Sequence, residues 1–373
     1  MKTMKRDIGT FSAALKPSTR TDGKTKVYFK VFISALSSKK ERARDLLYEV
    51  LTKTEFNDCE AMENIVKQAY IASEESFSQA GHRAAKSRAS AMQFTEGAVN
   101  EYYSGYEAHL RYKALSKSFE AEIDVLREKL KSFISKYLVR DRLTVSLAEG
   151  EREDSESFMR SVADLFVSSE KKTEPECKIR KLKRQREGIK IPAKVAFSSL
   201  VLNTESEGIG ELGRAAVASN LISFEYLWGE IRVKGGAYGA GMSSVRTGQT
   251  SFYSYRDPTP KRSIEKMKDS PSFLSEALGK KAEIEKYIIG AIGETSPYLT
   301  PRSRANIAVH RHLSCLTDEM RLEMREQILT ANKENLSLYA KKLAAAMKEA
   351  AYCIVAPRDM LGEECELDAI LDL

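Results

Sequence analysis

Twice along the chain, a strand-like run of alternating apolar residues leads into helical segments, and a second strand-like run closes the unit. The first unit opens with a predicted strand at 25–38 and closes with one at 142–150. The second unit opens at 193–203 and closes at 351–359. Alternation is typical of a half-buried strand, and strands followed by a separate run of helices are typical of α+β folds. The sequence therefore predicts two related α+β modules that arose from a weak internal duplication.

Helical periodicity fills most of the chain between these strands. Leu46, Leu47, Val50 and Leu51 share one helical face, for example, and comparable spacings recur in both units. The predicted helices lie at 39–56, 58–78, 82–92, 121–137, 209–230, 263–278, 281–292, 303–314, 318–329 and 333–351, and two further strand-like runs lie at 237–246 and 250–256.

A polar, basic stretch at 171–190 separates the two units and has no apolar periodicity, which is typical of a surface linker. We therefore expect domains at 1–170 and 191–373. A nucleic-acid-binding segment would favour aromatic residues among the basic ones, and this stretch has none. A solvated linker is the favoured interpretation.

The composition is that of a globular protein, with 42% hydrophobic and 30% charged residues, and the length suits about two domains. No apolar run of about 18 residues predicts a membrane span, and the N-terminus lacks the apolar core of a signal peptide. The five cysteines are scattered and odd in number, which favours reduced thiols and a cytoplasmic location, with an organelle matrix as the alternative. The net charge of +7 is modest for this length, so we expect neither a nucleic-acid nor a membrane partner.

Two familiar kinds of site are weakly represented. The run "GIGELG" at 208–213 matches a dinucleotide-binding fingerprint, but the preceding strand ends near Asn203, too early for the tight strand-to-glycine turn. A flexible loop leading into a helix is favoured, and a nucleotide-dependent enzyme stays a lesser alternative. None of the four histidines begins a His-Glu-x-x-His or His-x-x-Glu-His motif, so we predict no metal ligands in this chain.

The run "EIRVKGGAYGAGM" at 230–242 places a lone phenol, Tyr238, among four glycines. Glycine permits positive φ and the close approach of another backbone. An aromatic side chain on such a loop is often functional, but a packed ring beside a turn is an alternative that the residues alone leave open. The following "SYRDP" is interpreted as a strand end at a proline turn, with Arg256 and Asp257 as an ion pair.

Longer motifs resemble the C-terminal half of the presequence protease family, zinc metallopeptidases of the insulinase/pitrilysin superfamily. The resemblance is most specific in "LWGEIRVKGGAYGAGM" followed by "GQTSFYSYRDPTPKRSIE". Less specific agreement extends along nearly the whole chain, through "QAGHRAAKSRASAMQF", "QREGIKIPAKVAFSSLVLN" and "LTDEMRLEMREQIL". The resemblance implies two tandem modules of this family's type, each an antiparallel-rich sheet covered by helices.

The same resemblance implies a function and a site. Family members have four modules in two halves that close around a chamber, and the N-terminal half carries the zinc motif and the general base. This chain has neither, so zinc and its ligands are expected from an N-terminal partner half, on the same polypeptide or on a separate subunit. Arg232 and Tyr238 match the arginine and tyrosine that reach the zinc site across the chamber. Gly235, Gly236, Ala237 and Gly239 are expected to contact the peptide substrate.

We therefore interpret the chain as the C-terminal half of a zinc-dependent peptidase that degrades peptides in an enclosed chamber. It would supply contacts to the substrate and to the transition state, and it would be inactive alone because the zinc motif is absent. The alternative within the same superfamily is a non-catalytic partner subunit of a split heterodimer.

Overall fold

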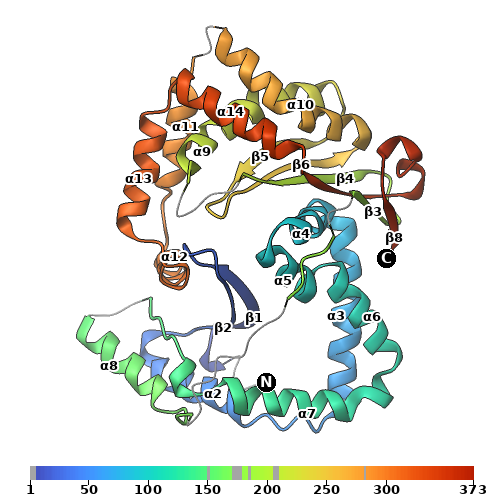
Figure 1. Ribbon diagram of the computed structural model, residues 1–373. Coiled ribbons are helices and arrows are strands. Elements are labelled where there is room, and N and C mark those ends of the chain that lie inside the picture. Colours follow the sequence, from blue (N-terminus) through green and yellow to red (C-terminus); the bar gives the residue numbers. More distant parts are fainter. Residues whose placement is uncertain (1–5, 149–151, 170–178, 184–185, 205–209, 281–282) are drawn as a thin grey trace.

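The computed structural model describes residues 6–148, 152–169, 179–183, 186–204, 210–280 and 283–373, which form an α+β architecture with two separate sheets (Figure 1). The strands are β1 (Thr10–Thr19), β2 (Thr25–Ser34), β3 (Arg186–Lys190), β4 (Ala196–Asn203), β5 (Gly239–Ser244), β6 (Gln249–Asp257), β7 (Ala351–Ala356) and β8 (Ala369–Asp372). The helices are α2 (Lys40–Thr52), α3 (Cys59–Gln79), α4 (Gly81–Gln93), α5 (Thr95–Ser104), α6 (Tyr106–Lys117), α7 (Phe119–Tyr137), α8 (Arg152–Ala163), α9 (Leu212–Ile222), the π-helix Ser223–Val233, α10 (Pro260–Gly279), α11 (Glu285–Thr295), α12 (Pro301–Ser314), α13 (Asp318–Leu329) and α14 (Lys333–Met347).

The larger sheet has six strands in the order β5-β6-β4-β7-β3-β8. Its central strands β4 and β7 are antiparallel to each other, and β3 is parallel to both β7 and β8. Both central strands are almost wholly buried because helices cover both faces of the sheet. Leu200 and Ile354 pack into the core shared with α10 and α14, whereas Phe197 and Val355 belong to the core on the side of α4.

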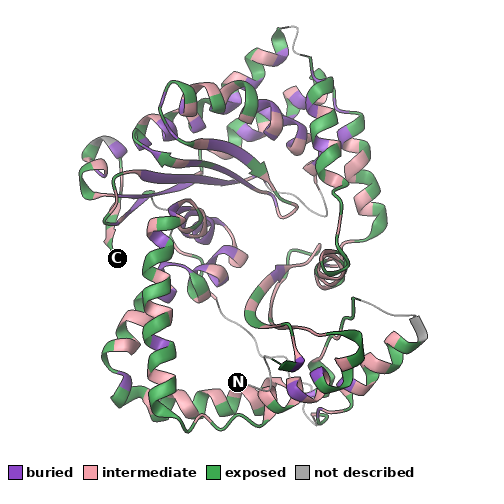
Figure 2. Ribbon diagram, turned by 180° about the vertical axis from the view of Figure 1, so that it is seen from behind, coloured by how far each residue is buried: buried purple, intermediate pink, exposed green. Residues whose placement is uncertain are grey.

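Small residues allow α4, from the first half of the chain, to pack tightly on this sheet. Gly81, Ala85 and Ala89 recur at every fourth position and so share one face of the helix. A Cβ on Gly81 would lie 2.4 Å from the ring of Phe197, and the other two residues are fully buried. The two halves of the chain therefore share a core. Figure 2 shows buried residues gathered at the larger sheet and the helices against it, while α7 and α8 are mostly intermediate or exposed.

An ion cluster lies beside this contact. The Arg88 guanidinium on α4 donates to Glu187 on β3 at 2.6 Å, to Glu101 on α5 at 3.2 Å and to Glu107 on α6 at 3.0 Å. Burial disfavours the charged guanidinium, but the hydrogen bonds and the charges of the carboxylates outweigh it and raise the pKa of Arg88. Burial likewise raises the pKa of Glu101, against the opposing charge of Arg88. The cluster thus joins three helices to the sheet, through buried charges on α4, α5 and β3 and a partly exposed carboxylate on α6.

The smaller sheet is a two-stranded antiparallel hairpin of β1 and β2. Its turn reaches the second half of the chain, where the Thr21 N–H donates to the carbonyl of Ser314 at the end of α12, at 3.0 Å. The predicted strand at 142–150 is wrong over its described part, because 140–142 form a 3₁₀ turn and 143–148 form no strand. That segment and β2 both line one cavity, and no strand pairing joins them. Alternation alone did not supply a pairing partner.

Four of the predicted helices agree closely with the structure, whereas part of the predicted linker is a strand. The helices at 58–78, 82–92, 303–314 and 318–329 are confirmed as α3, α4, α12 and α13. The strand β3 lies inside the predicted linker 171–190, which is wrong there because a central strand can have charged ends around only three buried residues. Residues 171–178 and 184–185 of that linker lie outside the described part of the chain, and the domain limits at 170 and 191 stay a prediction. No helix in the described ranges has the length and apolar character to cross a membrane.

Candidate functional site

The segment before the glycine run changes its helical form. Sequence periodicity predicts one helix at 209–230, whereas α9 ends at Ile222 and a π-helix continues from Ser223 to Val233. Leu227 and Ile231 are fully buried, and this apolar face anchors the π-helix to the core. The opposite side of the turn carries Trp228 to the surface, 43% exposed. π-Helices are rare and occur often at functional sites, which makes this turn a candidate.

Glycine is required in the turn after the π-helix. Gly236 has a φ of 81°, and its N–H donates to the carbonyl of Arg232 at 3.0 Å. A Cβ on Gly235 would lie 2.5 Å from the carbonyl oxygen of Ile231. Of the residues predicted to contact substrate, Gly235 and Ala237 are buried, Gly239 is half-buried and Gly236 is exposed. The glycines thus first serve the sharp return of the backbone into β5.

The turn holds Tyr238 at the surface with its backbone fixed. The Tyr238 N–H donates to the carbonyl of Tyr255 on β6 at 2.9 Å, and the two rings meet edge-on at 6.0 Å. The ring of His82, from α4, lies edge-on to Tyr255 at 5.0 Å. Tyr238 itself is 70% exposed, and no described residue hydrogen-bonds its hydroxyl. The phenol hydroxyl is therefore available to a ligand, while the backbone and the ring of Tyr238 are held by contacts with Tyr255.

Arg232 is also presented without a partner of opposite charge. Its guanidinium lies over the ring of Trp228, 3.8 Å from the centroid, and no carboxylate in the described part of the chain pairs with it. The neighbouring Glu230 is bound instead by Lys234 at 2.5 Å and Arg262 at 2.9 Å. The hydrogen bond from Lys234 and the two positive charges lower the pKa of Glu230, so this carboxylate stays charged and occupied.

The predicted ion pair of Arg256 and Asp257 is wrong. Arg256 has a φ of 50° and lies 5.6 Å from the Tyr255 ring centroid, whereas the buried Asp257 accepts a hydrogen bond from the Thr259 N–H at 2.8 Å. Successive residues of a strand point to opposite faces, which separates the two side chains. Asp257 therefore caps the proline turn that follows β6.

The dinucleotide-like run gains no support over its described end. Gly213 packs against α13, where a Cβ would lie 2.4 Å from the carbonyl oxygen of Met324. Its N–H donates to the side chain of Gln327 at 3.0 Å. This glycine is needed for the close packing of two helices, and residues 208 and 209 of the run lie outside the described part of the chain.

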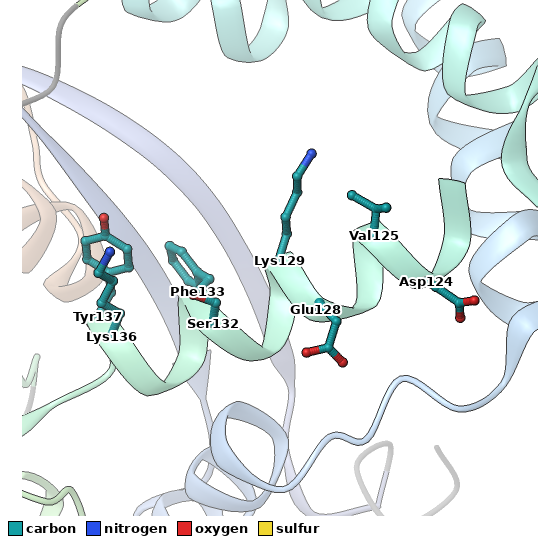
Figure 3. Close-up of a pocket in the computed structure, with 8 residues that line it drawn as sticks. All are labelled: Asp124, Val125, Glu128, Lys129, Ser132, Phe133, Lys136 and Tyr137. Carbon is teal, nitrogen blue, oxygen red and sulfur yellow. The ribbon is translucent and has the colours of Figure 1, made fainter. Parts of the chain in front are cut away.

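Neither of two hollows in the structure is formed by the loop that carries Arg232 and Tyr238. Within the described ranges, no group of three or more His, Cys, Asp or Glu side chains could hold a metal ion. A hollow along α7 is lined by that helix alone, with Lys129 and Val125 projecting to one side and Glu128 to the other (Figure 3). A larger cavity of about 2100 Å³ lies beside β2, α8 and α12. Neither is lined by Arg232 or Tyr238.

Sequence reasoning missed three residues of this site. Trp228 lies four positions before Arg232, a spacing that places two side chains side by side on a helix, so the signal was present. Tyr255 was interpreted only as part of a strand end. His82 comes from the first half of the chain, and no local pattern could have placed it against β6.

Family models match both halves of the chain. The model of the PreP C-terminal domain matches residues 186–357, and a model described as associated with subfamily C of the M16 peptidases matches residues 1–115. The first match contains the whole loop with Arg232 and Tyr238. The two matches support the assignment of the chain to the C-terminal half of an insulinase-family peptidase.

Individual relatives support this assignment. Protein HypA of Clostridium perfringens is 27% identical and covers 96% of this chain and 37% of its own length. The mitochondrial presequence protease of Saccharomyces cerevisiae is 26% identical and covers 87% of this chain and 34% of its own length. Presequence protease 1 of Arabidopsis thaliana is 27% identical, and the match covers 80% of this chain and 28% of the length of that protease. The chain thus spans about a third of the length of these relatives.

Solved structures with low sequence identity share the fold. Pitrilysin superposes with a TM-score of 0.58 at 13% identity, over 94% of this chain and 36% of its own. A protease from Helicobacter pylori superposes with a TM-score of 0.60 at 12% identity, over 95% of this chain and 83% of its own. A peptidase M16 inactive domain from Pseudomonas fluorescens superposes with a TM-score of 0.55 at 13% identity, over 92% of this chain and 81% of its own. At these identities the likeness concerns the fold alone, and it confirms the predicted α+β class.

The turn geometry leads to a stability prediction. Gly236→Ala should lower the free energy of unfolding by about 1–2 kcal/mol, because a side chain at positive φ is strained. Gly239→Ala is the matched control, since its Cβ would meet only the Cβ of Tyr255 at 3.9 Å. Urea unfolding of both variants measures the difference. Equal stability of the two would contradict the assigned backbone of the turn.

Proposed function

We propose that this chain is the C-terminal half of a zinc-dependent peptidase, in which Arg232 and Tyr238 bind the reacting part of a peptide. The observation that carries the proposal is the pair itself. Two polar side chains of the family-matched loop reach the surface, and neither has a hydrogen-bond partner for its donor groups among the described residues. Unpartnered donors on a backbone fixed by hydrogen bonds are suited to a ligand that supplies oxygen atoms.

Each residue would do a different part of the chemistry. The Tyr238 hydroxyl would donate a hydrogen bond to the amide oxygen of the scissile bond as negative charge develops on it. The Arg232 guanidinium presents a rigid fork of N–H donors and would hold a neighbouring carbonyl or carboxylate of the same peptide. Peptide backbone would pass over the exposed Gly236 and half-buried Gly239, where no side chain obstructs it. Zinc, with its ligands and the general base, would belong to the N-terminal half.

A second candidate is a non-catalytic partner subunit of a split peptidase. Its support is the fold likeness to the solved structure described as an inactive domain, which has a length close to that of this chain. In that case, the same face would complete or close a chamber formed with another chain. The exposed Tyr238 and the half-buried Arg232, both without partners among the described residues, favour the first candidate, because a closing surface needs no free donors at the family's substrate-contact positions.

One experiment separates the candidates. Cleavage of a quenched fluorescent peptide is measured with zinc for this chain alone, for a cognate half that carries a zinc motif, and for their mixture. Activity only in the mixture, and its loss with Arg232→Ala, would support a half that contacts the substrate. Equal activity of the mixture with and without that substitution would favour the non-catalytic subunit. Chelator-sensitive cleavage by this chain alone would overturn both.

A further inference from the structure

We infer that Trp228 is a positioning residue for Arg232, holding the guanidinium flat so that its N–H edges face an incoming peptide oxygen. The inference rests on the proposed role of Arg232, and it adds a residue to which neither the motif nor the relatives assign a part. It starts from one contact: the Arg232 guanidinium lies 3.8 Å from the centroid of the Trp228 ring. That distance is well within the range of a cation–π interaction, which indole makes more strongly than other rings.

The π-helix produces this contact. Trp228 and Arg232 are four positions apart and are neighbours on the helix surface. Leu227 and Ile231, one position earlier in each turn, are fully buried and fix the rotation of the helix about its axis. The ring and the guanidinium are thereby both directed outward. The pair is a product of the fold and not of a flexible surface chain.

Stacking uses the flat face of the guanidinium and leaves its edges free. The five N–H donors lie in the plane of the group, so a ring beneath that plane takes none of them. A second arrangement keeps nearby carboxylates away. Glu230 is bound by Lys234 and Arg262, and Glu225 is bound by Lys286 at 2.8 Å and by the Tyr287 hydroxyl. The N–H donors of the Arg232 guanidinium are therefore free to bind a ligand from outside the described part of the chain.

A held arginine binds an oxygen ligand better than a freely rotating one. Side-chain ordering opposes binding, and a group already restricted in its free state loses less freedom when the ligand arrives. Trp228 therefore contributes through Arg232, and its effect should vanish when Arg232 is absent. An aromatic replacement should retain most of the effect, and an aliphatic one of similar bulk should lose it.

The first test needs no peptidase activity. Trp228 is the single tryptophan of this chain, so its intrinsic fluorescence reports on its surroundings directly. Arg232→Met removes the stacked cation and should change the emission intensity or wavelength of the folded chain. Lys234→Met, a neighbouring cation that binds Glu230 instead, is the control and should leave the emission unchanged. Identical spectra for Arg232→Met and the unsubstituted chain would overturn the stacking.

The second test uses the assembled peptidase. Trp228→Leu should lower kcat/KM about threefold to tenfold, and Trp228→Phe should recover most of that loss. In an Arg232→Met background, Trp228→Leu should have no further effect, which a general packing defect would not produce. Phe224→Leu, on the same π-helix and 64% exposed, is the control expected to match the unsubstituted enzyme. Multiplicative losses in the double variant, or unchanged kcat/KM in Trp228→Leu, would overturn the inference.

The two tests separate this inference from the function on which it rests. An assembly that cleaves no peptide at all contradicts the proposed function, while the fluorescence of the chain still decides whether the pair is stacked. An active assembly in which Arg232 matters and Trp228 does not contradicts the positioning role alone. Should Trp228→Leu fail to fold, the fluorescence of Arg232→Met compared with Lys234→Met still decides whether the pair is stacked.

Discussion

Replacing Tyr238 by phenylalanine in the assembled peptidase should lower kcat about 100- to 1,000-fold, with a much smaller change in KM. The ring would keep its edge-on contact with Tyr255 and its backbone hydrogen bond, so only the hydroxyl is lost. A donor to the developing oxyanion acts mainly in the transition state, which is why turnover should fall more than substrate binding weakens. Steady-state kinetics with one fluorogenic peptide measure both quantities.

The matched control for this change is Tyr298→Phe. Tyr298 is 93% exposed and lies in the connection between α11 and α12, outside the loop that carries Tyr238. Its loss of a hydroxyl should leave kcat within about twofold. Turnover of Tyr238→Phe equal to that of the control would remove the proposed oxyanion role. A rise in KM with unchanged kcat would assign Tyr238 to ground-state binding instead.

The glycine–tyrosine loop could be predicted from sequence because its signal is local. The composition of a short run indicates a turn with positive φ, which the structure has at Gly236, whereas the exposure of Tyr238 was left open by the residues alone and comes from the structure. The partners of the loop could not be found in this way. His82 contacts Tyr255 although the two residues are more than 150 positions apart in the sequence. Only the packing of α4 on the sheet brings them together.

Strands show the same division between local and long-range information. β4 and β7 are rich in apolar residues and almost wholly buried, and they are recognisable without their neighbours. β3 is short and polar at its ends, and it is a strand because β7 and β8 flank it. Residues 143–147 have strand-like alternation but join neither sheet of the described residues, and the smaller sheet consists of β1 and β2 alone. Pairing partners, which no single segment encodes, decide these cases.

Arg88→Met should cost about 3–5 kcal/mol of the free energy of unfolding, the largest stability effect that we expect. The substitution leaves Glu101 and Glu187, whose side chains are 1% and 5% exposed, without their shared cation. Glu107→Gln is the control, because that partner is 39% exposed and its contact with Arg88 should contribute less than about 1 kcal/mol. Urea unfolding of the isolated chain measures both.

The pH dependence of that loss tests its cause. Burial already raises the pKa of Glu101 above its ordinary value of 4.5, and the positive charge of Arg88 opposes the rise. Without Arg88, the folded state should bind a proton that the unfolded state releases above about pH 4.5, so the stability of Arg88→Met should fall as pH rises from about 5 to 8. Adding Glu101→Gln and Glu187→Gln should flatten this dependence and recover part of the stability, because no buried charge is then left unpaired. A deficit that is equal at both pH values would instead point to lost packing around α4, and the shared core would then depend on shape and not on charge.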